Sequence, residues 1–161
     1  MVQLCCRRPG GTIHAREFQP VLGNNKKGLP IAIDRSKRVL VVEDDDSTRV
    51  AIKRLLNAAG FATAGYASAE ALLAAGPGED DACVVSDLAL PGLSGIELLG
   101  VLRTSGWLGP LILITAHDSP RVRQEAAHGG VAAYLAKPFL GNALVAAVQR
   151  AMGAPGTESR S

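Results

Sequence analysis

Four consecutive acidic residues directly follow an aliphatic run in the segment VLVVEDDDST, residues 39–48. Like charges a few ångströms apart repel each other by about 1 kcal/mol per pair in water. Asp45 and Asp46 have an ordinary explanation, because Asp and Glu are favoured as capping and first-turn residues of a helix. Glu43 and Asp44 come earlier, where the expected strand ends. This part of the sequence therefore predicts a site for a cation.

Three other polar residues also follow aliphatic runs: Asp87, Thr115 and Lys137. Taken singly, they have ordinary explanations as a polar loop residue, a β-branched strand end and a solvated cation. However, the expected strand ends near Glu43, Gly65, Asp87, Thr115 and Lys137 are separated by about 22, 22, 28 and 22 residues, one β-α unit each. Because the carboxyl ends of parallel strands meet at one edge of a sheet, we expect all of these side chains at one rim.

These residue types suit phosphoryl transfer to a carboxylate. Glu43, Asp44 and Asp87 offer the hard oxygen ligands that Mg²⁺ prefers. Asp87 is the expected nucleophile and would form an acyl phosphate. Thr115 can donate a hydrogen bond to one phosphoryl oxygen, and the Lys137 ammonium can pair with another.

The elements that position these residues are indicated by aliphatic runs alternating with helical patterns. Crossover helices must bury their apolar faces on the sheet, so five such units predict a parallel sheet covered on both sides. We expect an α/β fold, a flavodoxin-like doubly wound five-stranded parallel sheet of order 2-1-3-4-5 with five helices. The expected strands are 38–42, 61–66, 81–87, 110–115 and 131–136, and the expected helices lie around 51–59, 69–75, 96–102, 120–129 and 140–151.

Composition indicates one globular domain with appendages. The 161 residues are 47% hydrophobic, which is enough for a single core. Residues 1–36 are predicted to be a disordered basic tail, 37–152 the domain and 153–161 a second disordered tail. Three cysteines without C-x-x-C spacing argue against a disulfide framework or zinc site, and no apolar stretch approaches membrane-spanning length. We therefore expect a cytoplasmic protein that does not interact with membranes.

Four segments resemble the signature regions of the receiver domain of two-component response regulators. They are VLVVEDDDSTR, VVSDLALPGLSGIELL, ILITAH and AAYLAKPF, and the resemblance covers about residues 38–152. By this resemblance, Glu43 and Asp44 match the family's acidic pair and Asp87 matches its phosphoacceptor. Thr115 matches the switch hydroxyl, Lys137 the active-site lysine and Tyr134 the switch aromatic.

The resemblance carries further expectations. It implies that the backbone carbonyl of Ala89 helps to bind Mg²⁺ and that the Lys137–Pro138 peptide bond is cis. It also implies a histidine kinase or phosphotransfer protein as phosphoryl donor. Signalling would pass through the face formed by the fourth helix, fifth strand and fifth helix, where Tyr134 lies, with possible homodimerisation on phosphorylation. We expect a stand-alone receiver without a DNA-binding domain on this chain, and the downstream protein partner is not indicated.

Glu43, Ala89 and His117 need comment against the common pattern of the family. Glu43 replaces the more frequent aspartate and is one methylene longer, which would favour a water-mediated contact with the metal. Ala89 and His117 occupy positions that tune acyl phosphate hydrolysis in the family, and Ala89 offers no polar side chain there.

An enzymatic alternative also fits part of the sequence. The segment VLVVEDDDST, an apolar run followed by D-x-D-x-T, resembles the first motif of haloacid-dehalogenase-type phosphatases. In that interpretation Asp44 is the nucleophile, Asp46 is the acid, and Thr115 and Lys137 belong to the later motifs. That family needs an acidic pair downstream of the lysine, and Glu158 is the only acid there. A dinucleotide-binding module lacks its glycine-rich fingerprint after the first strand. A receiver-like fold used only for interactions would leave the complete set of site residues unexplained.

Overall fold

The structure is a computed structural model that describes residues 37–153. The tail predicted at 1–36 lies outside the described residues, and so does the tail predicted at 153–161 except for Gly153. The last helix includes Gly153, one residue beyond the predicted domain boundary.

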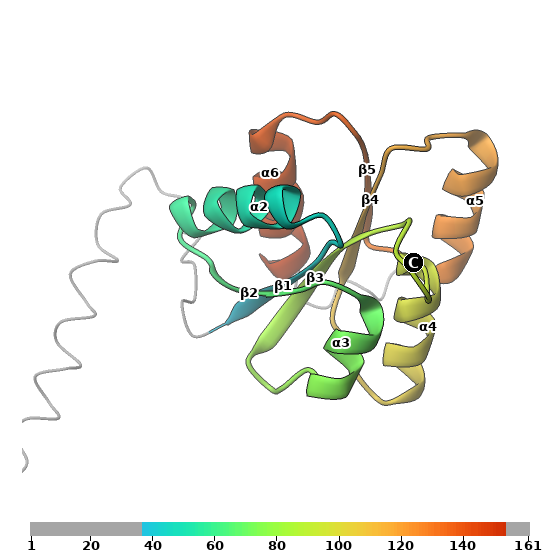
Figure 1. The fold of residues 1–161 in the computed structure, drawn as a ribbon, viewed down its shortest axis with the longest axis horizontal. Coiled ribbons are helices and arrows are strands. Elements are labelled where there is room, and N and C mark those ends of the chain that lie inside the picture. The colour runs from blue at the N-terminus through green and yellow to red at the C-terminus, as the bar shows by residue number, and fades with distance from the viewer. Residues whose placement is uncertain (1–36, 154–161) are drawn as a thin grey trace, which may run out of the picture. The chain divides into compact units, whose positions relative to one another are not determined.

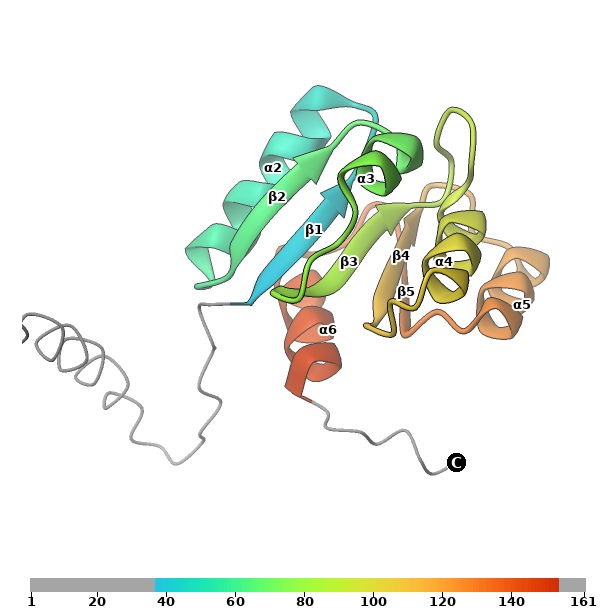
Figure 2. The ribbon, with the colours of Figure 1, turned by 90° about the horizontal axis from the view of Figure 1, so that it is seen from below.

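Five parallel strands form one sheet in the order β2-β1-β3-β4-β5, as predicted. Figure 2 shows the strands side by side with their arrowheads toward one edge. β1 and β4 are buried almost throughout, because both faces of the sheet are covered. The strands are β1 (Arg38–Val42), β2 (Ala62–Tyr66), β3 (Asp81–Asp87), β4 (Leu111–Thr115) and β5 (Ala133–Ala136).

Five helices within the described residues cover the two faces. One layer contains α2 and α6, which contact each other, and the other contains α3, α4 and α5, which contact in sequence order (Figure 1). This is the doubly wound arrangement that the sequence predicted. The helices are α2 (Asp46–Ala58), α3 (Ala69–Ala75), α4 (Gly95–Thr104), α5 (Pro120–Gly129) and α6 (Gly141–Gly153).

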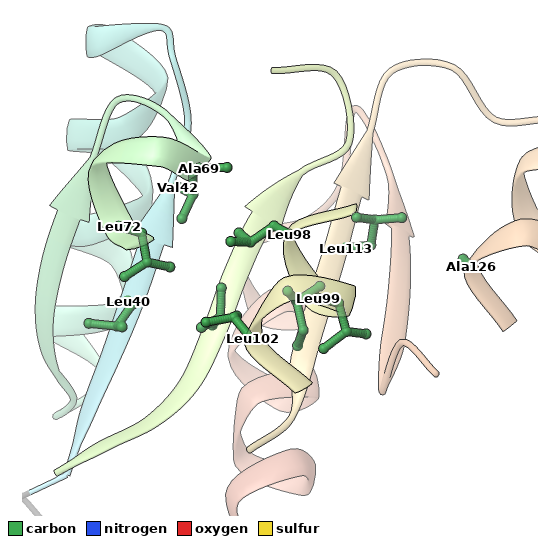
Figure 3. Close-up of a cluster of buried hydrophobic side chains, with 11 residues drawn as sticks. Leu40, Val42, Ala69, Leu72, Leu98, Leu99, Leu102, Leu113 and Ala126 are labelled. Carbon is green, nitrogen blue, oxygen red and sulfur yellow. The ribbon is translucent and has the colours of Figure 1, made fainter. Parts of the chain in front are cut away.

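Leucines form much of the core between the sheet and α3 and α4. Leu40 on β1, Leu72 on α3 and Leu98 on α4 are fully buried there (Figure 3). Burial of each such side chain contributes roughly 1.5–3 kcal/mol to folding. This apolar layer fixes where the strand ends, and therefore the rim residues, lie.

Serine side chains cap three helices at their amino ends. Ser68 and Ser119 each accept a hydrogen bond from a backbone N–H of the following first turn, and Pro120 occupies the first helical position after Ser119. Ser94 and Glu97 form a complete capping box at the start of α4. These caps fix the points at which the rim loops enter the helices.

A polar cluster lies at the opposite, amino edge of the sheet. The Arg38 side chain pairs with Asp81 at 2.6 Å, and the other Asp81 carboxylate oxygen accepts from the Gly78 N–H at 2.6 Å. The Trp107 indole N–H donates to the Asp81 carbonyl at 3.1 Å. Residues far apart in the sequence are thereby tied together away from the rim.

Within residues 37–153, no helix combines the length and apolar character needed to cross a membrane.

Candidate functional site

Lys137 lies directly after β5 and joins two buried carboxylates. Its Nζ donates to Glu43 Oε2 at 3.0 Å and to Asp87 Oδ2 at 3.1 Å. Glu43 and Asp87 are only 2% and 7% exposed. Glu43 directly follows β1, Asp87 ends β3 and Lys137 directly follows β5. The pairing of these strands in the sheet therefore brings together residues up to 94 positions apart in the sequence.

Glu43, Asp44 and Asp87 form the predicted acidic cluster. One carboxylate oxygen from each lies within 4.8 Å of the others, an arrangement that can hold a metal ion. Asp44 is exposed, whereas the other two acids are buried, so the cluster opens to solvent on the Asp44 side. Three carboxylates beside one lysine leave an excess negative charge that suits a divalent cation.

The loop after β3 folds back over Asp87. The Ala89 N–H donates to Asp87 Oδ1 at 3.2 Å, and the Leu88 N–H donates to the Ile114 carbonyl on β4 at 2.8 Å. Ala89, whose carbonyl is predicted to help bind the metal, is exposed and follows Asp87 by two residues. Its methyl side chain adds no polar group to the site.

Thr115 is the fully buried last residue of β4. Its Oγ1 accepts a hydrogen bond from the His117 N–H at 2.9 Å, which ties the hydroxyl to the loop before α5. The Lys137 N–H donates to the Thr115 carbonyl at 2.7 Å. Backbone pairing therefore places the threonine and lysine at the ends of the adjacent strands β4 and β5, at the edge where Asp87 lies.

Tyr134 is half-buried on β5 and belongs to a polar cluster of its own. Its hydroxyl donates to Asp118 Oδ1 at 3.0 Å. Arg123 forms an ion pair with the same carboxylate, and its guanidinium carbon lies 5.8 Å from the centre of the Tyr134 ring. The arginine and tyrosine lower the pKa of Asp118 by hydrogen bonding to its charged form.

Arg49 is a site residue that the sequence analysis did not identify. Its Nη1 donates to the Glu43 carbonyl at 2.6 Å, and its Nη2 pairs with Asp46. Asp45 caps α2 by accepting from the Thr48 N–H at 2.8 Å, as predicted for a capping residue. Asp46 and Arg49 are three residues apart on a predicted helix, a spacing that favours an ion pair. This spacing is the sequence signal by which Arg49 could have been connected to the site.

Burial and charge oppose each other within the site. Burial raises the pKa of Glu43, although the hydrogen bond from Lys137 acts in the opposite direction. Burial acts to lower the pKa of Lys137, but the hydrogen bonds to Glu43 and Asp87 and the negative charges of these two acids together outweigh it, so its pKa is raised. The lysine is therefore held in its charged form between the two carboxylates.

The Lys137–Pro138 peptide bond is cis, as expected from the resemblance.

Comparison with known proteins agrees with this geometry. The family model described as the response regulator receiver domain matches residues 39–149. The chain belongs to this family. The matched segment lies inside the predicted domain, and all predicted site residues fall within it.

The transcriptional regulatory protein FixJ of Azorhizobium caulinodans is 38% identical over 122 residues, which cover 76% of this chain and 58% of FixJ. The chain thus spans little more than half the length of this curated relative. The crystal structure of FixJ-N is 33% identical, with a TM-score of 0.67 over 72% of this chain and 93% of that one. A CheY-like receiver domain from Methanospirillum hungatei is 25% identical, with a TM-score of 0.69 over 76% and 98% of the two chains.

The phosphatase alternative finds no support. Asp46, its proposed acid, is exposed at the start of α2 and paired with Arg49, outside the acidic cluster. Lys137 instead contacts Asp87, which the phosphatase motif leaves without a role. The receiver family pattern, in contrast, includes both Lys137 and Asp87.

Proposed function

We propose that this receiver domain accepts a phosphoryl group on Asp87 from a histidine kinase or phosphotransfer protein. The observation that carries the proposal is the bond from Lys137, directly after β5, to Asp87 at the end of β3. A carboxylate held beside an ammonium and two further acids matches the needs of phosphoryl transfer. The chain acts as the phosphoacceptor of a relay.

The transfer forms one bond and breaks one. A carboxylate oxygen of Asp87 attacks phosphorus, the phosphorus–nitrogen bond of the donor phosphohistidine breaks, and its electron pair remains on the imidazole. Lys137 can then pair with one phosphoryl oxygen. The Thr115 hydroxyl, which now accepts from the His117 N–H, can donate to another.

Glu43, Asp44 and Asp87 together with the Ala89 carbonyl are the residues that would hold Mg²⁺. The fit rests on three carboxylates within 4.8 Å of one another, of which Lys137 neutralises only part. When bound, the cation neutralises charge on the transferring phosphoryl group. The longer Glu43 side chain already accepts from the Asp45 N–H at 3.2 Å, which orients its carboxylate within the loop.

An apolar groove beside the rim is a suitable docking surface for the phosphoryl donor. Residues at the start of α2 and around the start of α6 line it: Ser47, Thr48, Ala51, Ile52, Leu55, Phe139 and Gly141. Leu140, 73% exposed, lies next to two of them in the chain. A donor helix with an apolar face would bury this surface while presenting its phosphohistidine to Asp87.

Signalling would pass through the face formed by α5, β5 and α6. Movement of Thr115 toward the phosphoryl group would free space for the Tyr134 ring, which its bond to Asp118 now holds. A local charge change would thereby alter a two-state surface. A downstream protein or a second copy of the chain could read that surface, and a cytoplasmic location would suit both donor and partner.

The decisive experiment is intact-mass measurement after incubation with acetyl phosphate. We expect one added phosphoryl group, only with Mg²⁺ or Mn²⁺ present, and none in Asp87→Asn. Asp46→Asn is the matched control, because Asp46 is an exposed acid outside the cluster. Phosphorylation that persists in Asp87→Asn but disappears in Asp44→Asn would overturn the proposal in favour of the phosphatase mechanism.

A further inference from the structure

A carboxylate on α3 holds the loop that follows the phosphoacceptor. Glu70 Oε2 accepts a hydrogen bond from the Leu93 N–H at 2.9 Å, across 23 residues of sequence. This bond lowers the pKa of Glu70, because it favours the charged carboxylate. Glu70 lies outside the acidic cluster, and the phosphoryl-transfer proposal gives it no role.

The backbone beside this bond is shaped to receive the carboxylate. Gly92 has φ +86°, and a Cβ built there would lie 2.5 Å from Glu70 Oε2. A side chain at this position would therefore meet backbone strain, and its Cβ would push away the flexible end of the Glu70 side chain. Glycine lets the loop approach Glu70 closely enough for the Leu93 N–H to reach it.

Both ends of the loop, residues 88–94, are anchored. At its start, Leu88 donates to β4, and the Ala89 N–H donates to Asp87. At its end, the Leu93 N–H is bound by Glu70, and the Gly95 N–H donates to the Leu88 carbonyl at 3.1 Å. The Ala89 carbonyl lies in the loop between these anchors, so a displacement of the far end can be transmitted to it.

We propose that Glu70 is a positioning residue that fixes the 88–94 loop from α3 and so sets the affinity of the acidic site for its divalent cation. The inference rests on the proposed function, because it assigns the Ala89 carbonyl to the metal. Glu70 acts through the Leu93 N–H and does not touch the reacting atoms. Through Glu70, α3 would influence metal binding at the acidic site, whose residues lie at the ends of β1 and β3.

The test compares Glu70→Ala with Glu70→Gln, which keeps an acceptor oxygen. In metal-free protein, hydrogen exchange at the Leu93 amide should accelerate about 3- to 10-fold in Glu70→Ala and little in Glu70→Gln. Calorimetric titration with Mn²⁺ should show a Kd about 3- to 10-fold higher in Glu70→Ala. This is smaller than the typical loss for direct supports of metal ligands, about 10- to 100-fold, because the bond is exposed to solvent.

Phosphorylation by acetyl phosphate adds a third readout. The Glu70→Ala variant should need more Mn²⁺ to reach half its maximal rate, while the rate at saturating Mn²⁺ stays near that of the unmodified protein. Glu125→Ala is the matched control, since Glu125 is a surface carboxylate on α5 whose ion-pair partner is Arg121.

Unchanged Leu93 exchange and unchanged Mn²⁺ affinity in Glu70→Ala would overturn the inference, provided that the unmodified protein is phosphorylated on Asp87. A lower melting temperature with unaltered Mn²⁺ affinity would show a structural role alone and would also overturn it. Failure of the unmodified protein to accept phosphate is a different result, because it would refute the proposed function while the Leu93 exchange still reports on the Glu70 contact.

Discussion

At the residue scale, Lys137 compensates the charge of two buried acids. Its side chain is 26% exposed, while those of Glu43 and Asp87 are 2% and 10% exposed. Removing one partner of such an arrangement costs more than the pair contributes, because the remaining charges stay desolvated. The lysine therefore supports the fold as well as the proposed chemistry.

Replacing Lys137 with methionine should lower the free energy of unfolding by about 1–3 kcal/mol, below the full cost of breaking a buried pair because the lysine is partly exposed. Urea unfolding in the presence of EDTA measures the change without metal. Arg150→Met is the control, because Arg150 is an exposed cation near the end of α6. Equal effects of the two substitutions would contradict the assigned role.

Sequence reasoning identified the residues that strand ends bring together. Glu43, Asp87 and Lys137 were predictable because parallel strands fix their shared edge, whatever the side-chain rotamers. Arg49 was missed, since its bond to the Glu43 carbonyl depends on how a long side chain folds back from α2. Glu70 was missed for a similar reason, because its partner is a backbone N–H in a loop whose path the sequence does not specify.

At the scale of elements, α4 begins in close contact with the strand that carries Asp87. A Cβ built at Gly95 would lie 2.6 Å from the Asp87 carbonyl and 2.7 Å from a Leu113 methyl carbon. The first turn of this helix therefore lies against β3 and β4, with no room for a methyl group. This contact sets how near the helix can approach the phosphoacceptor.

Gly95→Ala should destabilise the protein by about 1–3 kcal/mol, the usual cost of overpacking a core. Gly100→Ala is a matched control in the same helix, because a Cβ there has nothing within 4 Å. It should stabilise the protein by about 0.5–1 kcal/mol through helix propensity. Thermal unfolding should show a lower melting temperature for Gly95→Ala and a higher one for Gly100→Ala. An unchanged melting temperature in Gly95→Ala would show that α4 can move away from the strands without loss of stability.

The cluster of Asp118, Arg123 and Tyr134 links the loop before α5 to β5. Hydrogen bonding to Arg123 and Tyr134 lowers the pKa of Asp118, so its stabilising contribution is present above the ordinary carboxyl pKa of about 4. The contribution is lost as the pH falls through the lowered value. NMR signals of the Tyr134 ring should therefore shift below about pH 4, and Asp118→Asn should abolish that dependence. Glu125→Gln should leave it intact.

Element boundaries were less predictable than element types. β2 and β5 begin later than the apolar runs at 61–66 and 131–136 indicated. The reason is that the Phe61 and Val131 N–H groups donate to the Leu56 and Ala126 carbonyls and so complete the ends of the preceding helices. In both cases the apolar residue directly after the glycine that ends a helix donates its N–H to that helix, and the strand starts after it.

At the scale of the whole molecule, Cys83 reports on unfolding. Its side chain is fully buried on β3, and burial raises the pKa of its thiol to about 12. The thiolate is the reactive form, so the folded protein protects this residue twice, by exclusion of reagent and by protonation.

In a variant with Cys5 and Cys6 replaced by serine, Cys83 should react with a disulfide reagent only when the domain opens. The labelling rate should rise with urea in parallel with the loss of circular dichroism. Rapid labelling in buffer without loss of helical signal would reveal local opening around β3 at much lower cost than global unfolding.

The direction of the first strand and last helix has a practical consequence for attaching other molecules. β1 starts at the amino edge of the sheet, and α6 runs back from the rim toward that same edge (Figure 2). Lys37 and Gly153 therefore both lie at the end of the domain remote from Asp87. A surface tether or fluorescent protein joined at either position is attached behind the rim and leaves the phosphoacceptor facing solution, so phosphorylation can be followed on immobilised protein.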